Sequence, residues 1–79
     1  MHLEIITPEK KLFTGEITSV KVPGTSGEFQ VLHNHAPIIS SLGKGKVTVK
    51  SSEGQQDFDI KSGVLEVLKN NIILLAESA

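Results

Sequence analysis

Turn-forming residues divide this sequence into short segments that show no helical pattern. Clusters rich in Gly, Pro, Asn and Ser recur along the whole chain, at spacings of roughly 8 to 12 residues. No window of about 11 residues keeps apolar side chains at a helical period. Gly and Asn tolerate positive φ and Pro presets φ at about −65°, so such clusters reverse the chain. The pattern is typical of an antiparallel β-sandwich or β-barrel.

The segments between the clusters predict about eight short strands in one domain that covers residues 1–79. The expected strands are residues 2–6, 17–22, 28–32, 37–42, 46–50, 57–60, 64–68 and 72–76. Among the breaks, Phe13-Thr14-Gly15 and Ser62-Gly63 are both expected to be turns. The expected fold class is therefore all-β.

Two of the expected strands are apolar on both faces. Residues 46–50 and 57–60 alternate apolar with polar side chains, which predicts one buried face and one solvated face. Residues 64–68 and 72–75 are apolar at nearly every position instead. Such strands either lie centrally between two sheets or lend their outer face to a partner protein, and the pattern leaves both interpretations open.

Composition excludes several classes of partner. The net charge is −1, and the eight cationic residues are all lysines dispersed along the chain, so no basic face is present to follow a phosphate backbone. Three Phe without Tyr or Trp offer little for stacking bases. The longest apolar run, residues 72–76, is far shorter than the span of about 20 residues that crosses a membrane. We expect no nucleic-acid partner and no direct membrane insertion.

A pair of histidines, His33 and His35, is the first candidate for a metal site. On an extended strand these side chains would point to the same face and could share one ion. Gly27, five residues and then His-x-His resemble the first half of a cupin motif. Cupins place a glutamate four or five positions later, where this chain has Ile39 and Ser40, and no histidine follows His35. Because catalytic metal sites generally need three protein ligands, we expect no metal site.

No other catalytic pattern is present in the sequence. The chain has no cysteine and no Gly-x-Ser-x-Gly elbow. Asp57 and Asp59 fall on one face of an alternating strand, which indicates its solvated side and not an acid and base pair. The glycines lack the spacing of a phosphate loop. We therefore expect no catalytic and no cofactor-binding residues.

Five short motifs identify a family. In chain order they are His2-Leu3-Glu4-Ile5-Ile6-Thr7-Pro8 running into Leu12-Phe13-Thr14-Gly15, Val20-Lys21-Val22-Pro23-Gly24 with Gly27-Glu28-Phe29, His35-Ala36-Pro37, Ser62-Gly63-Val64-Leu65-Glu66-Val67, and Asn71-Ile72-Ile73-Leu74-Leu75-Ala76-Glu77. Each is weak alone, but five in order from end to end are specific. Together they resemble the N-terminal β-sandwich domain of the ε subunit of the F-type ATP synthase.

The resemblance implies a fold, a function and partners. The fold would be a small two-sheet antiparallel β-sandwich of about 8–10 short strands. The function would be that of a non-catalytic rotor subunit in the central stalk, which helps couple rotation driven by protons or sodium ions to ATP synthesis. It would bind the γ subunit and the c-ring as a monomer within the complex, without a cofactor. Its location would be the cytoplasmic side of a bacterial inner (plasma) membrane, held there peripherally.

The resemblance also implies which residues contact partners. Carried over position by position, the c-ring side is Gly27 and Glu28, and the γ side is His35, Ala36, Pro37 and Ser40. Two simpler interpretations remain, in which Glu28 is a solvated glutamate at the start of a strand and Pro37 only stiffens a loop. His33 has no role implied by the family.

The end of the chain departs from the family pattern. Most members continue with two helices that can inhibit ATP hydrolysis, and this sequence stops where those helices would begin. We interpret it as a naturally short form, with a piece cut at the domain boundary as the alternative. Two other functions compete with the rotor interpretation: a cupin-like protein that takes up metal through His33 and His35, and a small module that binds peptides or carbohydrates.

Overall fold

Eight β-strands make up the computed structural model of the protein, which describes residues 1–78. They are β1 (His2–Ile6), β2 (Lys11–Glu16), β3 (Ser19–Gly24), β4 (Gly27–Leu32), β5 (Ile38–Leu42), β6 (Gly45–Ser51), β7 (Gly54–Leu68) and β8 (Asn71–Ser78). The described residues form no helix, and so none that could cross a membrane. The predicted all-β class is confirmed.

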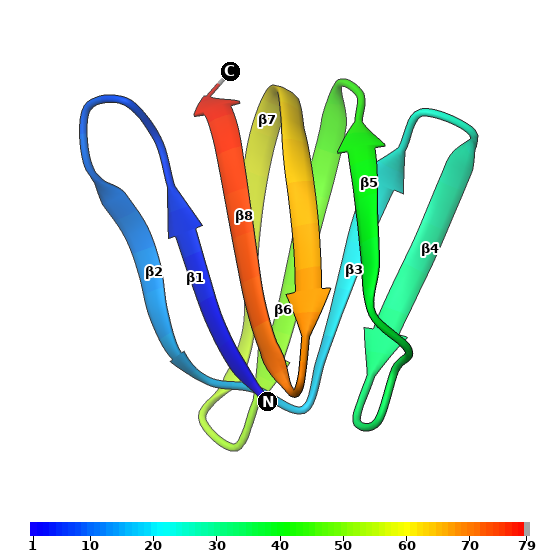
Figure 1. The fold of residues 1–79 in the computed structure, drawn as a ribbon. Coiled ribbons are helices and arrows are strands. Elements are labelled where there is room, and N and C mark those ends of the chain that lie inside the picture. The colour runs from blue at the N-terminus through cyan, green and yellow to red at the C-terminus, as the bar shows by residue number, and fades with distance from the viewer. Residues whose placement is uncertain (79) are drawn as a thin grey trace.

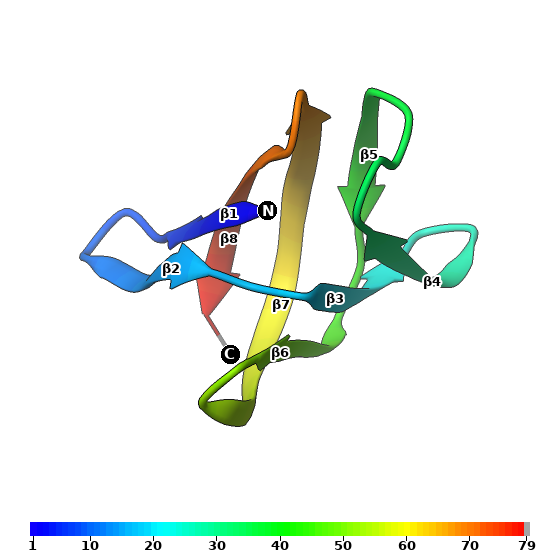
Figure 2. The same ribbon diagram turned by 90° about the horizontal axis from the view of Figure 1, so that it is seen from below.

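The strands form one hydrogen-bonded sheet that folds over into two layers (Figures 1 and 2). The first layer contains β2, β1, β8, the C-terminal part of β7, and β5. The second contains the N-terminal part of β7, followed by β6, β3 and β4. The predicted sandwich is confirmed, and its two layers are joined through the bent strand β7 (Figure 1).

The break predicted at Ser62-Gly63 is a bend within β7 and not a turn between two strands. The expected strands 57–60 and 64–68 are therefore one element, whose register against β8 shifts between Ile60 and Ser62. A side chain at Gly63 would place its Cβ 2.7 Å from the carbonyl oxygen of Leu75. Glycine is needed here because the two backbones approach closely, so the glycine signal marked a crossing between layers and not a reversal.

The break predicted at residues 13–15 was also wrong, because these residues lie inside β2, a strand that the sequence pattern missed. The chain reverses earlier, where the backbone N–H of Thr7 donates to the carbonyl of Lys10 at 2.8 Å. Phe13 is half-buried and meets Phe58 edge-to-face, with ring centroids 6.2 Å apart. Aromatic and β-branched residues favour a strand, and here that preference outweighs the glycine.

One strand pair is parallel, which corrects the prediction of a purely antiparallel sandwich. β1 and β8 run in the same direction, with His2 opposite Asn71 and Ile6 opposite Leu75. These strands lie at opposite ends of the chain, so no hairpin imposes an antiparallel direction on them. All other pairs are antiparallel.

Aliphatic side chains fill the space between the layers. The buried ones are Leu3, Ile5, Ile17, Val20, Val22, Val31, Leu42, Val47, Val49, Ile60, Leu65, Val67, Ile72, Leu74 and Ala76. The three Phe residues are only half-buried and pack at the border of this core. Because strand side chains alternate between faces, the same strands must point their remaining side chains outward, and these outward faces differ between the two layers.

Candidate partner-binding surfaces

The outer side of the first layer carries an apolar surface, here called the apolar face. It consists of Ile39 on β5, Val64 and Leu68 on β7, and Ile73 and Leu75 on β8, with exposed fractions from 36% to 75%. Strand register places Val64 opposite Leu75. The sequence pattern indicated apolar runs on both faces of two strands, and the structure favours the second of the two open interpretations, an outer face available to a partner.

The outer side of the second layer is polar, and is called the polar face. Its exposed side chains are Lys21, Gln30, Lys46, Lys50, Gln55, Asp57 and Asp59. Lys46 Nζ lies 4.0 Å from Asp57 Oδ2. Both aspartates are exposed, as predicted for a solvated strand face. Among residues 1–78, Leu32 is the one exposed large apolar side chain of this layer, so the two outer faces suit different surroundings.

Gly27 and Glu28, predicted to face the c-ring, form the exposed tip of the β3–β4 hairpin. Gly24 pairs with Gly27 across a two-residue turn. Gly27 has φ of +130°, and no atom lies within 4 Å of where its Cβ would be. Only glycine adopts such a φ readily. Glu28 is exposed and has no ion-pair partner among the described residues, so its charge is available to a ligand or partner.

His35, Ala36 and Pro37, predicted to face γ, lie at the other end of β4, in the loop that leads to β5 (Figure 1). The His35 N–H donates to the carbonyl of Leu32 at 3.1 Å, and Asn34 has φ of +67°. Positive φ at the third residue is the feature of a type II turn. The turn holds the tripeptide at the surface, away from the β3–β4 hairpin.

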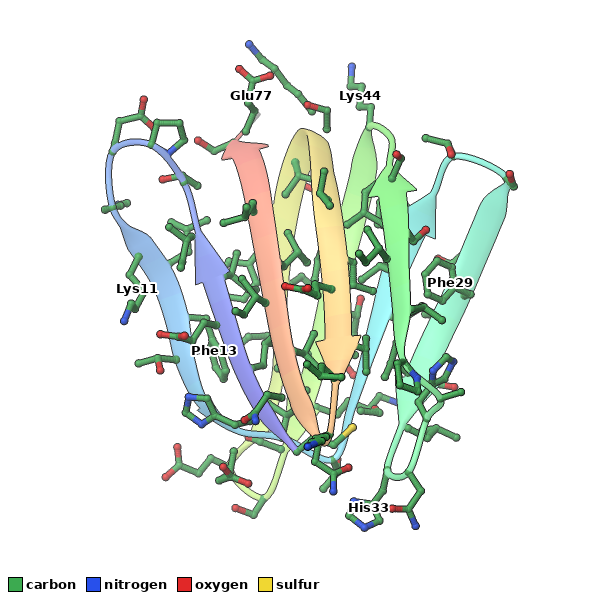
Figure 3. All side chains as sticks on the ribbon, in the orientation of Figure 1. Lys11, Phe13, Phe29, His33, Lys44 and Glu77 are labelled. Atoms are coloured by element: carbon green, nitrogen blue, oxygen red, sulfur yellow. The ribbon has the colours of Figure 1, made fainter. Side chains whose placement is uncertain are left out.

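The same turn separates the two histidines of the cupin-like pattern. The pattern could place both side chains on one face only if the backbone were extended, and the chain instead turns at Asn34. His35 Nδ1 lies 2.7 Å from the carbonyl oxygen of Ala36, and His33 projects from the end of the molecule (Figure 3). No group of three or more His, Cys, Asp or Glu side chains within residues 1–78 is placed to hold a metal ion.

Ser40 departs from its predicted grouping. It is half-buried on β5 and helps to line a hollow of about 500 Å³ between residues 24–29 and 38–40. This hollow also contains Gly27 and Glu28. The structure thus brings one residue predicted for the γ side next to the two predicted for the c-ring side, while His35, Ala36 and Pro37 lie at the opposite end of β4.

One ion pair borders the apolar face. Glu4 lies beside Ile73 on the neighbouring strand, and its Oε2 is 2.8 Å from Lys11 Nζ. The hydrogen bond from Lys11, followed by the charge of the same side chain, lowers the pKa of Glu4 below its ordinary value. A carboxyl group with a lowered pKa in the folded state stabilises the fold above its unfolded pKa, and this contribution disappears as the pH falls through the folded pKa.

Replacing Lys11 with methionine should therefore remove stability at neutral pH but not in acid. We expect the urea midpoint of Lys11→Met to lie below that of the natural chain at pH 7, and the difference to shrink as the pH falls below about 4. Urea titrations from pH 7 to pH 2.5 would measure it. Lys50→Met is the control, because Lys50 is exposed on the polar face without a carboxylate partner among the described residues. A difference that does not depend on pH would contradict the role of the pair.

Comparison with known proteins decides the family. Residues 1–79 match the family model described as the ATP synthase delta/epsilon chain β-sandwich domain. The chain belongs to this family. It is 43% identical over 79 residues to the ATP synthase epsilon chain of Caulobacter vibrioides, covering 100% of this chain and 92% of that protein. It is 49% identical over 76 residues to the epsilon chain of Chlorobaculum tepidum, covering 95% and 86%.

A solved structure shows that this delta/epsilon-type domain shares its fold with more distant proteins. In the mitochondrial ATP synthase central stalk and c-ring of Tetrahymena thermophila, one chain superimposes with a TM-score of 0.82 at 14% identity, over 98% of this chain and 63% of that chain. The family match and the relatives confirm the predicted identification as a non-catalytic, epsilon-type subunit of ATP synthase, a membrane-bound complex. The assignments of Gly27, Glu28, His35, Ala36, Pro37 and Ser40 to particular partners stay predictions.

Proposed function

We propose that this chain, as one domain over residues 1–79, is a rotor subunit of the central stalk that binds the γ subunit and the c-ring. It acts on the cytoplasmic side of a bacterial inner membrane, held there through its protein partners, and helps couple ion-driven rotation to ATP synthesis. The observation that carries the proposal is the match of the whole chain to the delta/epsilon family. The contrast between an apolar face and a polar face supports a body that is covered by protein on one side.

The γ subunit would cover the apolar face together with the loop that contains Pro37. Pro37 lines a shallow depression with Ile39, Glu66 and Leu68, so the predicted γ side is continuous with the apolar face. A standard interface buries about 800 Å² on each partner. That is roughly one sixth of the 4767 Å² accessible surface of this chain, an area that one outer face of the sandwich can supply.

The c-ring would contact the tip of the β3–β4 hairpin. Glu28 offers an exposed carboxylate there, while the adjacent Gly27 keeps the backbone open to a close approach. A carboxylate at the rim of an interface mainly affects the association rate and partner choice. The Glu28 carboxylate would contact a basic or amide-rich loop of the ring.

Charge reversal at Glu28 should weaken attachment to the c-ring by about tenfold at low salt, with γ affinity changed by less than about threefold. Retention of Glu28→Lys on vesicles that contain the purified ring, in the presence of γ, would measure the first effect. Calorimetry with γ alone would measure the second. Glu53→Lys makes the same change in the β6–β7 turn, at the other end of the molecule (Figure 1). Normal attachment of the Glu28 variant would reject the ring contact.

Binding to purified γ tests the proposed function as a whole. We expect a stable complex with one copy of each chain, and co-purification of both with the c-ring from native membranes. Absence of any complex with γ at micromolar concentration would reject the proposal.

A further inference from the structure

One side of the sandwich has two strand edges that are almost unpaired. β4 is the last strand of the sheet and, within residues 1–78, pairs only with β3. The edge of β5 that faces away from β7 pairs with β3 at a single position, Leu42 opposite Gly24. β5 lies in the first layer and β4 in the second (Figures 1 and 2). The hollow lined by residues 24–29 and 38–40 lies between them. We call this hollow and the two edges the β4–β5 seam.

The hydrogen-bond alternation shows which groups of β4 point into the seam. In an antiparallel pair, hydrogen-bonded and non-bonded positions alternate. Gly24 and Gly27 close a two-residue hairpin, so they are a hydrogen-bonded pair. Phe29 and Val31 then bond to β3, whereas Glu28 and Gln30 direct their N–H and C=O groups away from it. Two residues of this edge therefore present both a donor and an acceptor to the seam.

Strand β5 also directs backbone N–H and C=O groups into the seam. The carbonyl of Ser41 accepts a hydrogen bond from the N–H of Thr25 at 3.1 Å, on the side away from β7. By the same alternation, the N–H and C=O of Ile39 point to that side, and its side chain is 75% exposed. The seam thus has backbone donors and acceptors on both borders.

The β4 edge has few of the features that usually prevent strand addition. Natural proteins protect edges with charged side chains, Lys above all, with Pro or with bulges. β4 (Gly27–Leu32) contains neither Lys nor Pro, and Glu28 is its one charged residue. Its pairing with β3 keeps one register over six positions. The other outer edge of the sheet differs, because β2 begins with Lys11 and its pairing with β1 shifts between Ile5 and Ile6. The seam is therefore the better of these two edges for an added strand.

Side chains in the seam indicate what the added strand would carry. Phe29 and Ile38 are half-buried at the edge of the core and line the hollow. Glu28 is the only charged residue among those that line it. A matching strand would direct an apolar side chain toward Phe29 and Ile38, and would leave the Glu28 carboxylate to the c-ring contact proposed above.

We propose that the β4–β5 seam receives an extended segment of the γ subunit, which adds to the edge of β4 by backbone hydrogen bonds. The proposal rests on the proposed function, since it deepens the contact with γ. The loop with His35, Ala36 and Pro37 lies at one end of the seam and Glu28 at the other, so the segment would run from the predicted γ side toward the predicted c-ring side.

Amide hydrogen exchange of this chain, alone and bound to purified γ, tests the proposal directly. In the free chain, the amides of Gln30 and Ile39 should exchange fast, and those of Phe29 and Val31 slowly. On binding γ, Gln30 and Ile39 should slow by at least about tenfold. A stable complex in which both amides still exchange at their free rates would overturn the added strand and leave γ binding intact. Failure to form a complex would reject the proposed function, and the added strand with it.

Substitution of Gln30 by proline provides a second test of the added strand. Gln30→Pro removes a donor that points into the seam and leaves the β3–β4 hydrogen bonds in place, as an edge position allows. We expect affinity for γ to fall by about tenfold. Gln30→Thr changes the same side chain but keeps the donor, and Thr14→Pro makes the same change at the β2 edge; both should bind normally. Equal affinity of Gln30→Pro and Gln30→Thr, with folding confirmed by circular dichroism, would overturn the proposal.

Discussion

Replacing Leu74 with alanine should lower the free energy of unfolding by about 3 kcal/mol. Its side chain is fully buried, and strand register places it between Ile5 on β1 and Leu65 on β7. The truncation would leave a cavity in a thin core that cannot collapse to fill it. A domain of this size has a total stability of roughly 5 to 10 kcal/mol, so urea denaturation should show the loss of a large part of it.

The adjacent leucine is the matched control for this prediction. Leu75 has the same chemistry and neighbouring position, but it is 53% exposed and points outward from β8. Leu75→Ala should cost less than about 1 kcal/mol. Equal losses for the two variants would contradict the register of β8, because a shift by one residue would exchange its inner and outer faces.

A lysine at position 75 should reduce affinity for γ by roughly a hundredfold while leaving the isolated domain folded. Leu75 lies opposite Val64 in the apolar face, and an ammonium group there would lose its hydration in the proposed interface with γ. Calorimetry would give the affinity, and the urea midpoint would show that the fold is intact. Because Leu75 is already exposed, the free chain should tolerate the change.

Gln55→Lys is the control for the apolar face. It adds the same charge at an exposed position of the polar face, opposite Lys50 on β6, and γ should bind this variant normally. A γ affinity that falls equally for both lysine variants would indicate a general charge effect. Normal binding of Leu75→Lys would show that γ contacts another surface.

Local patterns in the sequence predicted six of the strands well, and the two errors have one cause. Turn residues and alternation placed strands near β1, β3, β4, β5, β6 and β8 within a few residues. In both errors a glycine signal was interpreted as a reversal: residues 13–15 lie inside β2, and Gly63 lies at the bend of β7. A glycine permits the chain to reverse but does not require it, and whether the chain reverses depends on contacts with strands distant in the sequence.

Contacts between distant strands could not be predicted from the sequence alone. Nothing local indicates that β1 pairs with β8, or that this pair is parallel. The candidate partner-binding surfaces were likewise predicted only in part from the sequence. The family resemblance pointed to the Gly27-Glu28 tip and the His35 loop, and both lie at the surface. The apolar face could be assigned to residues only once register was known, and only the fold shows Ser40 and Glu28 lining one hollow.

The continuous strand β7 has a mechanical consequence for a part that turns with a rotor. Two stacked sheets held only by side-chain packing can slide past each other under shear. Here one strand runs through both layers, paired with β6 in the second and with β5 and β8 in the first. Sliding would have to break backbone hydrogen bonds of β7 with its neighbours and deform the bend at residues 60–63. Force applied to one layer should therefore reach the other without slip.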